Sequence, residues 1–276
     1  MIVKRVSILS AVLLILFLSL NVSAADALRL NVHSAILMDM RTGRILVAQN
    51  ANAPIQPASI TKVLTLYLAD EAIQDGRVQP GDQVKISRKA VRTGGSKMFI
   101  EAGSEIPLEE LLKGMAVVSA NDASVAVAEY IGGDVRRFVA RMNRKARQLG
   151  MTRSFFKNPN GLPAKGQFTT ARDMLILASD YLQRFPESLD LHSQQYYTYR
   201  DITQRNRNSL LRYYPNADGL KTGWVRKAGY HIVATAKRGE TRLIAVVMGA
   251  KTSGIRARET ERLLDEGFRM VGEREG

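Results

Sequence analysis

Ser59 and Lys62, three residues apart, are the side chains of this sequence best suited to nucleophilic catalysis. They open an apolar run with helical spacing, so on a helix both side chains would lie on one face. A serine hydroxyl is a weak nucleophile until a base takes its proton. Lys62 can be that base only if burial or a neighbouring cation lowers its pKa. The pair therefore predicts covalent chemistry at Ser59, at the start of a helix whose positive end favours an oxyanion.

A second polar triplet, Ser119-Ala120-Asn121, supplies groups that the same reaction would need. Ser119 would carry a proton between Lys62 and the leaving group. Asn121 would hold an amide carbonyl of the substrate and help to fix Lys62. Taken alone, this serine and this asparagine could equally satisfy free backbone groups at a turn between two helices.

The third triplet, Lys221-Thr222-Gly223, completes the order S-x-x-K, S-x-N, K-T-G that is typical of acylating serine enzymes. Lys221 would be the cation that lowers the pKa of Lys62. We expect the triplet on the edge of a strand whose backbone pairs with an extended substrate, with Gly223 leaving room for that approach. Lys221 and Thr222 would then face a carboxylate of the ligand. Taken alone, the triplet also fits the start of a hairpin with an exposed lysine.

Similar short patterns occur elsewhere in the chain, but only one set has all three triplets in order. Ser154-Phe155-Phe156-Lys157 repeats the first pattern and runs straight into Asn-Pro-Asn-Gly, which predicts a turn. Ser19-Leu20-Asn21 repeats the second pattern inside an apolar N-terminal run. Because short patterns arise by chance, each needs a fitting context. The context favours Ser59 as the nucleophile.

The first residues have the composition of a secretory signal peptide. Lys4 and Arg5 precede an apolar run over residues 8–20, and Val22-Ser23-Ala24 is a small-residue cleavage site. That run is shorter than the about 20 residues of a comfortable membrane span, although an uncleaved anchor is the alternative. We therefore expect residues 1–24 to be a signal peptide and the protein to be exported, to the periplasm or envelope of a bacterium.

Composition narrows the chemistry further. The chain has 0 Cys, so no disulfide framework is expected, and its 3 His are scattered without the spacing of a metal site. We expect neither a metal nor a cofactor. A formal net charge of +14 favours anionic partners, such as the cell wall or an acidic membrane surface. No nucleic-acid motif accompanies the charge, and a soluble basic surface without a partner explains it equally well.

Periodicity along the chain predicts strands at both ends and helices between them. Alternating or apolar runs predict strands, and apolar residues at helical spacing between caps and glycines predict helices. The simplest arrangement is of the α/β class, α+β type: one antiparallel sheet flanked by terminal helices, with an inserted helical lobe. Residues 25–276 fit a single domain of this kind. The expected strands are 34–38, 44–48, 229–237 and 242–249, with a short one within 79–87, and the expected helices are 60–73, 107–118, 121–132, 134–149, 170–182 and 254–271.

Beyond the triplets, nearly the whole chain resembles the serine-type D-Ala-D-Ala carboxypeptidases, which are low-molecular-mass penicillin-binding proteins. The resemblance implies the fold shared by β-lactamases and transpeptidases. It also implies removal of the terminal D-Ala from peptidoglycan stem pentapeptides, with β-lactams as covalent inhibitors. The matching segments are Pro57-Ala58-Ser59, Gly94-Gly95-Ser96, Leu111-Leu112-Lys113-Gly114-Met115, Ser119-Ala120-Asn121-Asp122-Ala123, Thr170-Ala171-Arg172-Asp173-Met174, Asn206-Arg207-Asn208, Asp218-Gly219-Leu220-Lys221-Thr222-Gly223 and Lys227-Ala228-Gly229-Tyr230.

The resemblance also assigns groups that the triplets alone do not. It implies an oxyanion hole formed by the backbone N–H groups of Ser59 and Trp224. It points to Arg256 and Arg207 as partners of the terminal carboxylate, for which an arginine fork is well suited. The sequence departs from many relatives at Asn160-Gly161-Leu162-Pro163, where they have His-Gly-Leu-Asp. The short stretch after Gly223 predicts no second C-terminal domain.

Three other functions stay open at this point. A DD-endopeptidase that cleaves peptide cross-links would use the same residues. A class A β-lactamase would need a deacylating glutamate, for which Glu187 is the nearest candidate and is badly placed in the sequence. A non-catalytic module that binds the wall or senses β-lactams would have no need of the intact Ser59 and Lys62.

Overall fold

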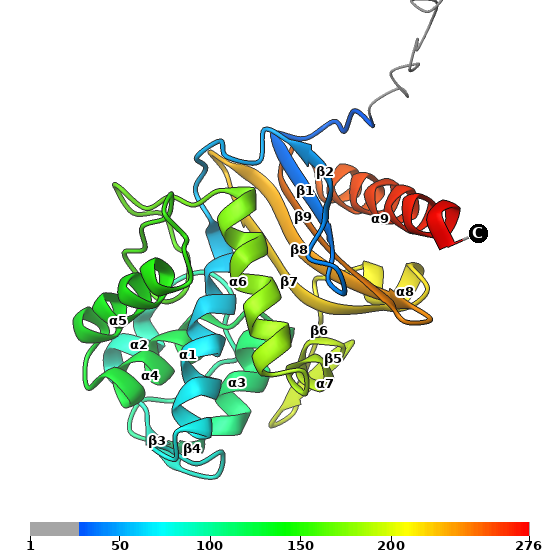
Figure 1. The fold of residues 1–276 in the computed structure, drawn as a ribbon. Helices are drawn as coiled ribbons and strands as arrows, with labels where there is room; N and C mark the ends of the chain where they lie inside the picture. Colours follow the sequence, from blue (N-terminus) through cyan, green and yellow to red (C-terminus); the bar gives the residue numbers. More distant parts are fainter. Residues whose placement is uncertain (1–27, 276) are drawn as a thin grey trace, which may run out of the picture.

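Residues 28–275, which the computed structural model describes, centre on a five-stranded antiparallel sheet built from both ends of the chain (Figure 1). The predicted signal peptide at residues 1–24 lies outside the described residues. The sheet has the order β2-β1-β9-β8-β7, so β7 forms one edge. Its strands are β1 (Ser34–Asp39), β2 (Ile45–Gln49), β7 (Ala217–Val225), β8 (Gly229–Arg238) and β9 (Thr241–Ala250).

Both faces of this sheet are covered, which explains why the middle residues of β8 and β9 are buried one after another instead of alternately. Every residue of β1 is buried. The C-terminal helix α9 (Ser253–Glu275) packs on one face, where a side chain at Gly267 would collide with Leu37 and Leu243. On the other face, α6 (Ala171–Arg184) contacts β1 and β9. The prediction of two-sided cover is confirmed, but only one of the covering helices is terminal.

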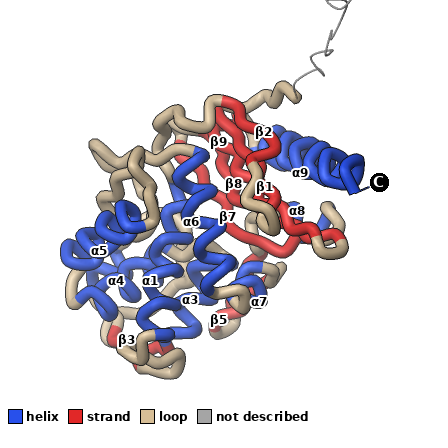
Figure 2. Tube along the Cα trace, in the orientation of Figure 1, coloured by secondary structure: helices blue, strands red, loops and turns tan. Residues whose placement is uncertain are grey.

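A helical lobe lies between β2 and β7 in the chain and beside the sheet in space (Figure 2). Its buried centre is α4, in which ten of twelve residues are buried. The lobe contains α1 (Lys62–Gln74), α2 (Arg88–Arg92), α3 (Leu108–Val117), α4 (Asn121–Gly132), α5 (Val135–Gln148) and α6, and the short strands β3 (Gln83–Lys85) and β4 (Glu105–Pro107) pair at its far end.

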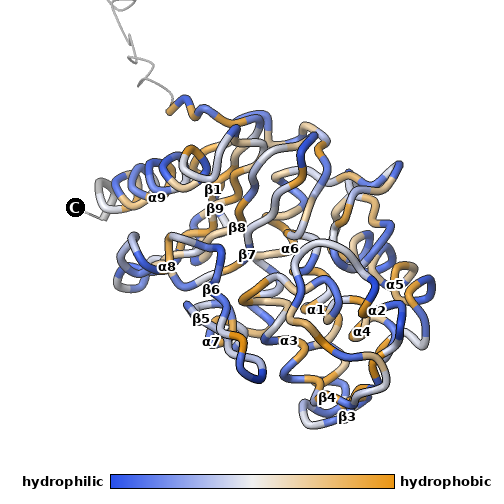
Figure 3. The backbone as a smooth tube through the Cα atoms, turned by 180° about the vertical axis from the view of Figure 1, so that it is seen from behind, coloured by the Kyte–Doolittle hydropathy of each residue, from blue (hydrophilic) through white to orange (hydrophobic). Residues whose placement is uncertain are grey.

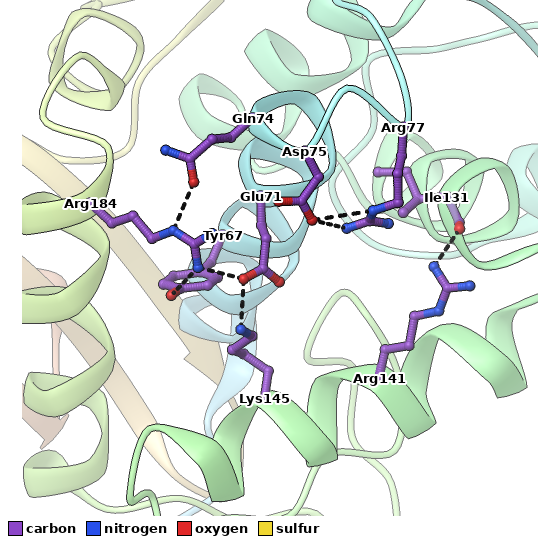
Figure 4. A network of polar contacts seen from close by, with 9 residues as sticks. All are labelled: Tyr67, Glu71, Gln74, Asp75, Arg77, Ile131, Arg141, Lys145 and Arg184. Atoms are coloured by element: carbon purple, nitrogen blue, oxygen red, sulfur yellow. Dashed lines mark hydrogen bonds and ion pairs between the residues drawn. The ribbon is translucent and has the colours of Figure 1, made fainter.

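Polar contacts connect three helices of this lobe (Figure 4). Glu71 of α1 accepts a hydrogen bond from Lys145 of α5 at 2.7 Å and another from Arg184 of α6. Arg184 also donates to the hydroxyl of Tyr67, and burial raises the pKa of that hydroxyl to about 12. The network holds α1, which carries Lys62, between its two neighbours.

Helix boundaries follow the predicted caps closely. Asp134 accepts a hydrogen bond from the backbone of Arg137, and Thr170 accepts one from Asp173, so both predicted N-caps are confirmed. The first helix differs, because a 3-10 turn (Ala58–Thr61), labelled η2, precedes α1. The remaining described helices are α7 (Ser188–His192) and α8 (Leu210–Tyr213).

One hairpin, β5 (Tyr196–Tyr199) with β6 (Ile202–Arg205), was not expected from the sequence. Most of its residues are at least partly exposed, so the apolar alternation that signals a strand is weak. Its turn contains Arg200 at a positive φ of 51°, where a glycine or asparagine would have been a clearer signal.

Hydrophilic and hydrophobic residues alternate around α9, as its position on one face of the sheet requires (Figure 3). Within residues 28–275, no helix combines the length and the apolar character that crossing a membrane requires.

Candidate active site

Ser59 lies in the 3-10 turn η2 at the junction of the helical lobe and the sheet. The turn faces a cleft of about 560 Å³, which Ser59 lines. Ala58, directly before it, has a φ of 50°, a conformation that is strained for a residue with a side chain. Strained backbone of this kind concentrates at functional sites, because the surrounding structure must hold it in place. Here it turns the chain so that Ser59 faces the cleft.

Lys62 is fully buried, and its Nζ atom has three oxygen atoms as hydrogen-bond partners. Its Nζ atom lies 2.7 Å from Oδ1 of Asn121 and 2.9 Å from the carbonyl oxygen of Asn160. Both of these oxygens can only accept, so they would take the two N–H groups of a neutral amine. The third neighbour is the hydroxyl oxygen of Ser59, at 3.0 Å. As a donor, Nζ contacts this oxygen; if Lys62 is neutral, the Ser59 hydroxyl can instead donate its proton to the lone pair of Nζ.

The electrostatic surroundings of Lys62 favour its neutral form. Burial lowers the pKa of Lys62 well below 10.5, and the positive charges of Lys221 and Arg207 lower it further. Asp122 acts weakly in the opposite direction. The prediction that burial and a neighbouring cation would prepare Lys62 as a base therefore agrees with the structure.

Asn121 is fixed by a glycine-rich loop. Its backbone N–H donates to the carbonyl of Ser96 at 2.7 Å, and its Nδ2 donates to the carbonyl of Gly94 at 2.8 Å. A side chain at Gly95 would place its Cβ 2.6 Å from that Nδ2, so the loop needs a glycine there. Asn121 lines the cleft, and the second hydrogen of its Nδ2 is available to a substrate.

Ser119 also lines the cleft and has a φ of 65°, so its backbone, like that of Ala58, is strained. Within the described residues its hydroxyl has no hydrogen bond, and no direct bond joins it to Lys62. Ser119 therefore faces the cleft beside Asn121 with its hydroxyl free to contact a ligand.

The third triplet lies on β7, at the predicted sheet edge. A Cβ at Gly223 would lie 3.0 Å from the backbone nitrogen of Ser59 and 3.1 Å from that of Ile60. The space left by this glycine is therefore filled by the turn that carries Ser59. We expected Gly223 to make room for a substrate, but in the structure it lets β7 approach the nucleophile.

His231 of β8, which is paired with Gly223, holds the chain that leads into this turn. Its Nδ1 accepts a hydrogen bond from the backbone N–H of Gly249 at 2.9 Å. Its Nε2 must then carry the proton and donate to the carbonyl of Gln56, also at 2.9 Å. Burial lowers the pKa of His231 to about 4, consistent with a neutral ring that positions the segment before Ser59.

Lys221 is a buried amine that forms no ion pair within residues 28–275. It does not line the cleft, and within the described residues its Nζ donates to one acceptor, the carbonyl of Thr222, at 3.2 Å. Burial lowers the pKa of Lys221 to about 7, and the charges of Arg207 and Arg256 contribute to this shift. Thr222, the next residue of β7, lines the cleft.

Arg256 and Arg207 both line the cleft, as predicted. Arg256, from the first turn of α9, is 5% exposed. Its Nη2 donates a hydrogen bond to the carbonyl of Arg207 at 3.4 Å. Its Nε is buried and has no hydrogen-bond partner among the described atoms. Burial lowers the pKa of Arg256 to about 10. Arg207 itself is exposed.

The loop that presents Arg207 is pinned by the asparagines on either side. Nδ2 of Asn206 donates to the carbonyl of Gln194, and Oδ1 of Asn206 accepts from the backbone of Asn208. Nδ2 of Asn208 reaches the carbonyl of Gly219 at the start of β7. The Asn-Arg-Asn segment therefore fixes the position of one arginine relative to the strand that carries Lys221.

The wall of the cleft next to Gly223 is aromatic. Trp224 is 53% exposed, and its ring lies 5.9 Å from that of Tyr230, its partner on β8. Leu162 and Pro163 also line the cleft. A ligand in the cleft would thus meet apolar as well as charged surface.

Neither alternative candidate residue belongs to this site. The hydroxyl of Ser154 contacts Asp173 and Thr169, so the second S-x-x-K pattern has a structural role. Glu187 is exposed and does not line the cleft. No residue among the described ones that line the cleft is an aspartate or a glutamate. Groups of three or more metal-ligating side chains are also absent from residues 28–275.

Asn160 was missed as a functional residue by reasoning from the sequence. Its backbone carbonyl, not its side chain, contacts Lys62. The loop can come this close because Gly161 has no side chain; a Cβ there would lie 1.8 Å from the carbonyl oxygen of Ala58. The only signal in the sequence is the turn-forming Asn-Pro-Asn-Gly segment.

Comparisons with known proteins agree with this geometry. A model of the D-alanyl-D-alanine carboxypeptidase family matches residues 21–252. The chain is 42% identical over 241 residues to D-alanyl-D-alanine carboxypeptidase DacF of Bacillus subtilis, a match that covers 85% of this chain and 61% of that protein. The match spans about three fifths of the length of this relative and of the D-alanyl-D-alanine carboxypeptidases DacC and DacA of Escherichia coli.

Solved structures show the same fold. Penicillin binding protein 6B of Escherichia coli is 40% identical with a TM-score of 0.83, covering 86% of this chain and 77% of that one. Penicillin-Binding Protein D2 of Listeria monocytogenes, solved in an ampicillin-bound form, is 30% identical with a TM-score of 0.80, covering 87% and 98%. Because the family model matches most of the chain and the fold agrees, the chain belongs to the D-alanyl-D-alanine carboxypeptidase family.

Proposed function

We propose that this protein is a serine-type D-Ala-D-Ala carboxypeptidase that releases the terminal D-Ala of peptidoglycan stem pentapeptides. One observation carries the proposal: Lys221, Arg207 and Arg256 gather beside the Ser59–Lys62 pair without a carboxylate in the cleft wall. A buried cation that lacks a partner destabilises the fold, so its presence at a nucleophile indicates that an anion arrives with the ligand.

The reaction starts with the proton of Ser59. Lys62 takes that proton while the oxygen attacks the carbonyl carbon of the penultimate D-Ala. The developing oxyanion is held by the backbone N–H groups of Ser59 and Trp224. Ser119 carries the proton from Lys62 to the nitrogen of the leaving D-Ala, and the peptide bond breaks. Water, deprotonated by Lys62, then hydrolyses the ester on Ser59.

Recognition of the substrate divides between backbone and charge. The stem peptide lies extended along the free edge of β7, in the manner of an added strand. Its terminal carboxylate meets Thr222 and the two arginines, Arg256 and Arg207, while Lys221, buried behind the cleft wall, adds positive charge. Asn121 donates to an amide carbonyl of the peptide. Charge-assisted hydrogen bonds to a carboxylate are roughly twice as strong as hydrogen bonds between neutral groups.

β-Lactams should act as covalent inhibitors, because they also present a strained amide and a carboxylate. The ampicillin-bound form of the Listeria monocytogenes relative supports this part of the proposal.

We further propose that the protein is exported to the bacterial envelope after loss of residues 1–24. A single catalytic domain over residues 25–276 stays a prediction. The net charge of +14 would suit a peripheral contact with an anionic wall or membrane surface.

The test is a choice between two substrates. A purified pentapeptide ending in D-Ala-D-Ala should release free D-Ala, measured by chromatography, while a cross-linked peptide dimer should be cleaved much more slowly. Ser59→Ala should release none, whereas Ser154→Ala, the matched control from the second S-x-x-K pattern, should remain active. Faster cleavage of the dimer would favour the DD-endopeptidase. Inactivity of the wild type on both substrates would favour a non-catalytic wall-binding or β-lactam-sensing module.

A further inference from the structure

Arg226 is a charged residue of the cleft to which the reaction assigns no role. It directly follows the last residue of β7 and lines the same cleft as Ser59 and Trp224. Its side chain is exposed, and within the described residues it has no hydrogen bond and no ion pair. The neighbouring Lys227 is also exposed but does not line the cleft.

The direction of the substrate places Arg226 opposite one particular part of the peptide. In the proposed function the terminal carboxylate lies at Thr222 and the attacked carbonyl lies beside Trp224. The peptide therefore runs from Thr222 past Trp224 toward Arg226 as it is followed back toward its N-terminus. Extended residues advance about 3.3 Å each, so the residue before D-Ala-D-Ala reaches the end of β7.

Arg226 begins the turn between β7 and β8, which the hydrogen bond from the backbone N–H of Ala228 to the carbonyl of Val225 closes at 3.1 Å. Trp224 and Arg226 are exposed, whereas Val225 between them is 7% exposed. Both line the cleft. Arg226 thus extends the aromatic wall of Trp224 with a positive charge.

Among the described residues, no aspartate or glutamate lines the cleft to balance this charge or to pair with a cationic substrate group. The terminal carboxylate already has the positive charge of Lys221, Arg256 and Arg207. Arg226 is at the other end of the binding path, beyond Trp224. It could therefore pair only with a second anionic group of the substrate. A guanidinium group is suited to a carboxylate, with which it can form two parallel hydrogen bonds.

We propose that Arg226 selects stem peptides whose third residue, the one before D-Ala-D-Ala, carries a free carboxylate on its side chain. This proposal rests on the proposed function and specifies its substrate class. A diamino-dicarboxylic acid at that position presents such a carboxylate, whereas a lysine presents only a cation. Arg226 is then a specificity-determining residue, which acts on binding and not on the reacting atoms.

Two synthetic peptides isolate the carboxylate. Both end in Lys-D-Ala-D-Ala; in one the lysine Nε carries a succinyl group with a free carboxylate, and in the other that carboxylate is a neutral amide of nearly the same shape. The measured quantity is the ratio of kcat/KM for D-Ala release from the two peptides. An exposed ion pair contributes up to about 1 kcal/mol, so the expected ratio is about 3 to 5 in favour of the carboxylate.

Variants assign that preference to one side chain. Arg226→Gln should bring the ratio to about 1, Arg226→Glu should invert it, and Arg226→Lys should restore part of it. Lys227→Gln, the matched control outside the cleft, should keep the wild-type ratio. Raising the salt concentration should lower the wild-type ratio, because salt screens exposed charges.

The outcomes separate this inference from the proposed function. If the wild type releases D-Ala from both peptides at equal rates, the role of Arg226 is refuted but the proposed carboxypeptidase activity is not. A preference that persists in Arg226→Gln would also refute that role. Release from neither peptide would refute the carboxypeptidase activity itself, and the inference with it.

Discussion

The Nζ atom of Lys62 lies 3.0 Å from the hydroxyl oxygen of Ser59. The other two neighbours of this amine are carbonyl oxygens, which accept hydrogen bonds and cannot donate them. A neutral Lys62 therefore has both N–H groups satisfied and its lone pair directed at Ser59. This geometry, together with the lowered pKa of Lys62, is what the proposed role of the lysine as base rests on.

Lys62→Arg should abolish acylation by penicillin while the protein stays folded. An arginine keeps the positive charge but does not lose its proton at any working pH, so it cannot take the proton of Ser59. Acylation would be followed by mass spectrometry and folding by circular dichroism. Lys157→Arg, the matched change in the second S-x-x-K pattern, should acylate normally. A folded Lys62→Arg protein with near-normal acylation would exclude Lys62 as the base.

Arg207→Ala should move the pH profile of acylation toward higher pH. The charge of Arg207 lowers the pKa of both Lys62 and Lys221. Lys62 must be neutral to act, so the rate rises with pH through its pKa. Lys221 must be protonated to hold a carboxylate, so kcat/KM falls as pH rises through its pKa of about 7 in the free protein. Without Arg207 both pKa values rise, and both limbs move upward.

This shift separates an electrostatic role of Arg207 from a structural one. A merely distorted site would lower the height of the profile without moving its limbs. Arg205→Ala, an exposed arginine on β6 outside the cleft, should leave the limbs in place. An unmoved profile in Arg207→Ala would contradict the pKa shifts described above.

Arg256→Ala should reduce peptide turnover by roughly 10- to 100-fold. Loss of a hydrogen bond to a charged group costs about 1.5–3 kcal/mol, which corresponds to that range. The effect should be smaller for a reactive thioester substrate, whose acylation depends less on binding. Arg258→Ala, two residues further along α9 and outside the cleft, is the control. Unchanged turnover in Arg256→Ala would leave recognition of the carboxylate to Lys221 and Thr222.

Gly223→Ala should slow acylation, by less than about 100-fold, without unfolding the protein. The added Cβ would lie 3.0 Å from the backbone nitrogen of Ser59, so the turn that carries Ser59 must move by a few tenths of an ångström. Displacement of a reacting group by about 1 Å can reduce a rate about 100-fold, and this displacement is smaller. Gly81→Ala is the control, since a Cβ there has no neighbour within 4 Å. Equal acylation rates in the two variants would show that the turn has room to adjust.

The sequence allowed the sheet, the lobe and most catalytic side chains to be predicted, because those features have local signals. The caps at Asp134 and Thr170 and the apolar runs of β8 and β9 are such signals. The hairpin of β5 and β6 has none, since its residues are largely exposed and its turn lacks a glycine. It packs against α3, a contact that no local pattern encodes.

Site residues that contribute a side chain could be predicted from the sequence. Site residues that contribute only a backbone group could not. Ser59, Lys62 and Asn121 stand in recognisable triplets, and the structure brings them together. The carbonyl of Asn160 has no residue-type signature, since any residue has one. The purpose of Gly223 was also misjudged, because the sequence does not show which neighbour occupies the space that a glycine leaves.

The central claim is that Ser59 is the nucleophile, and one measurement tests it most directly. The protein is incubated with penicillin, digested and mapped by mass spectrometry at several times after removal of free drug. The account predicts one adduct, on the peptide that contains Ser59, which disappears as the ester hydrolyses. An adduct on the peptide of Ser154, or no adduct in a folded protein, would contradict the account.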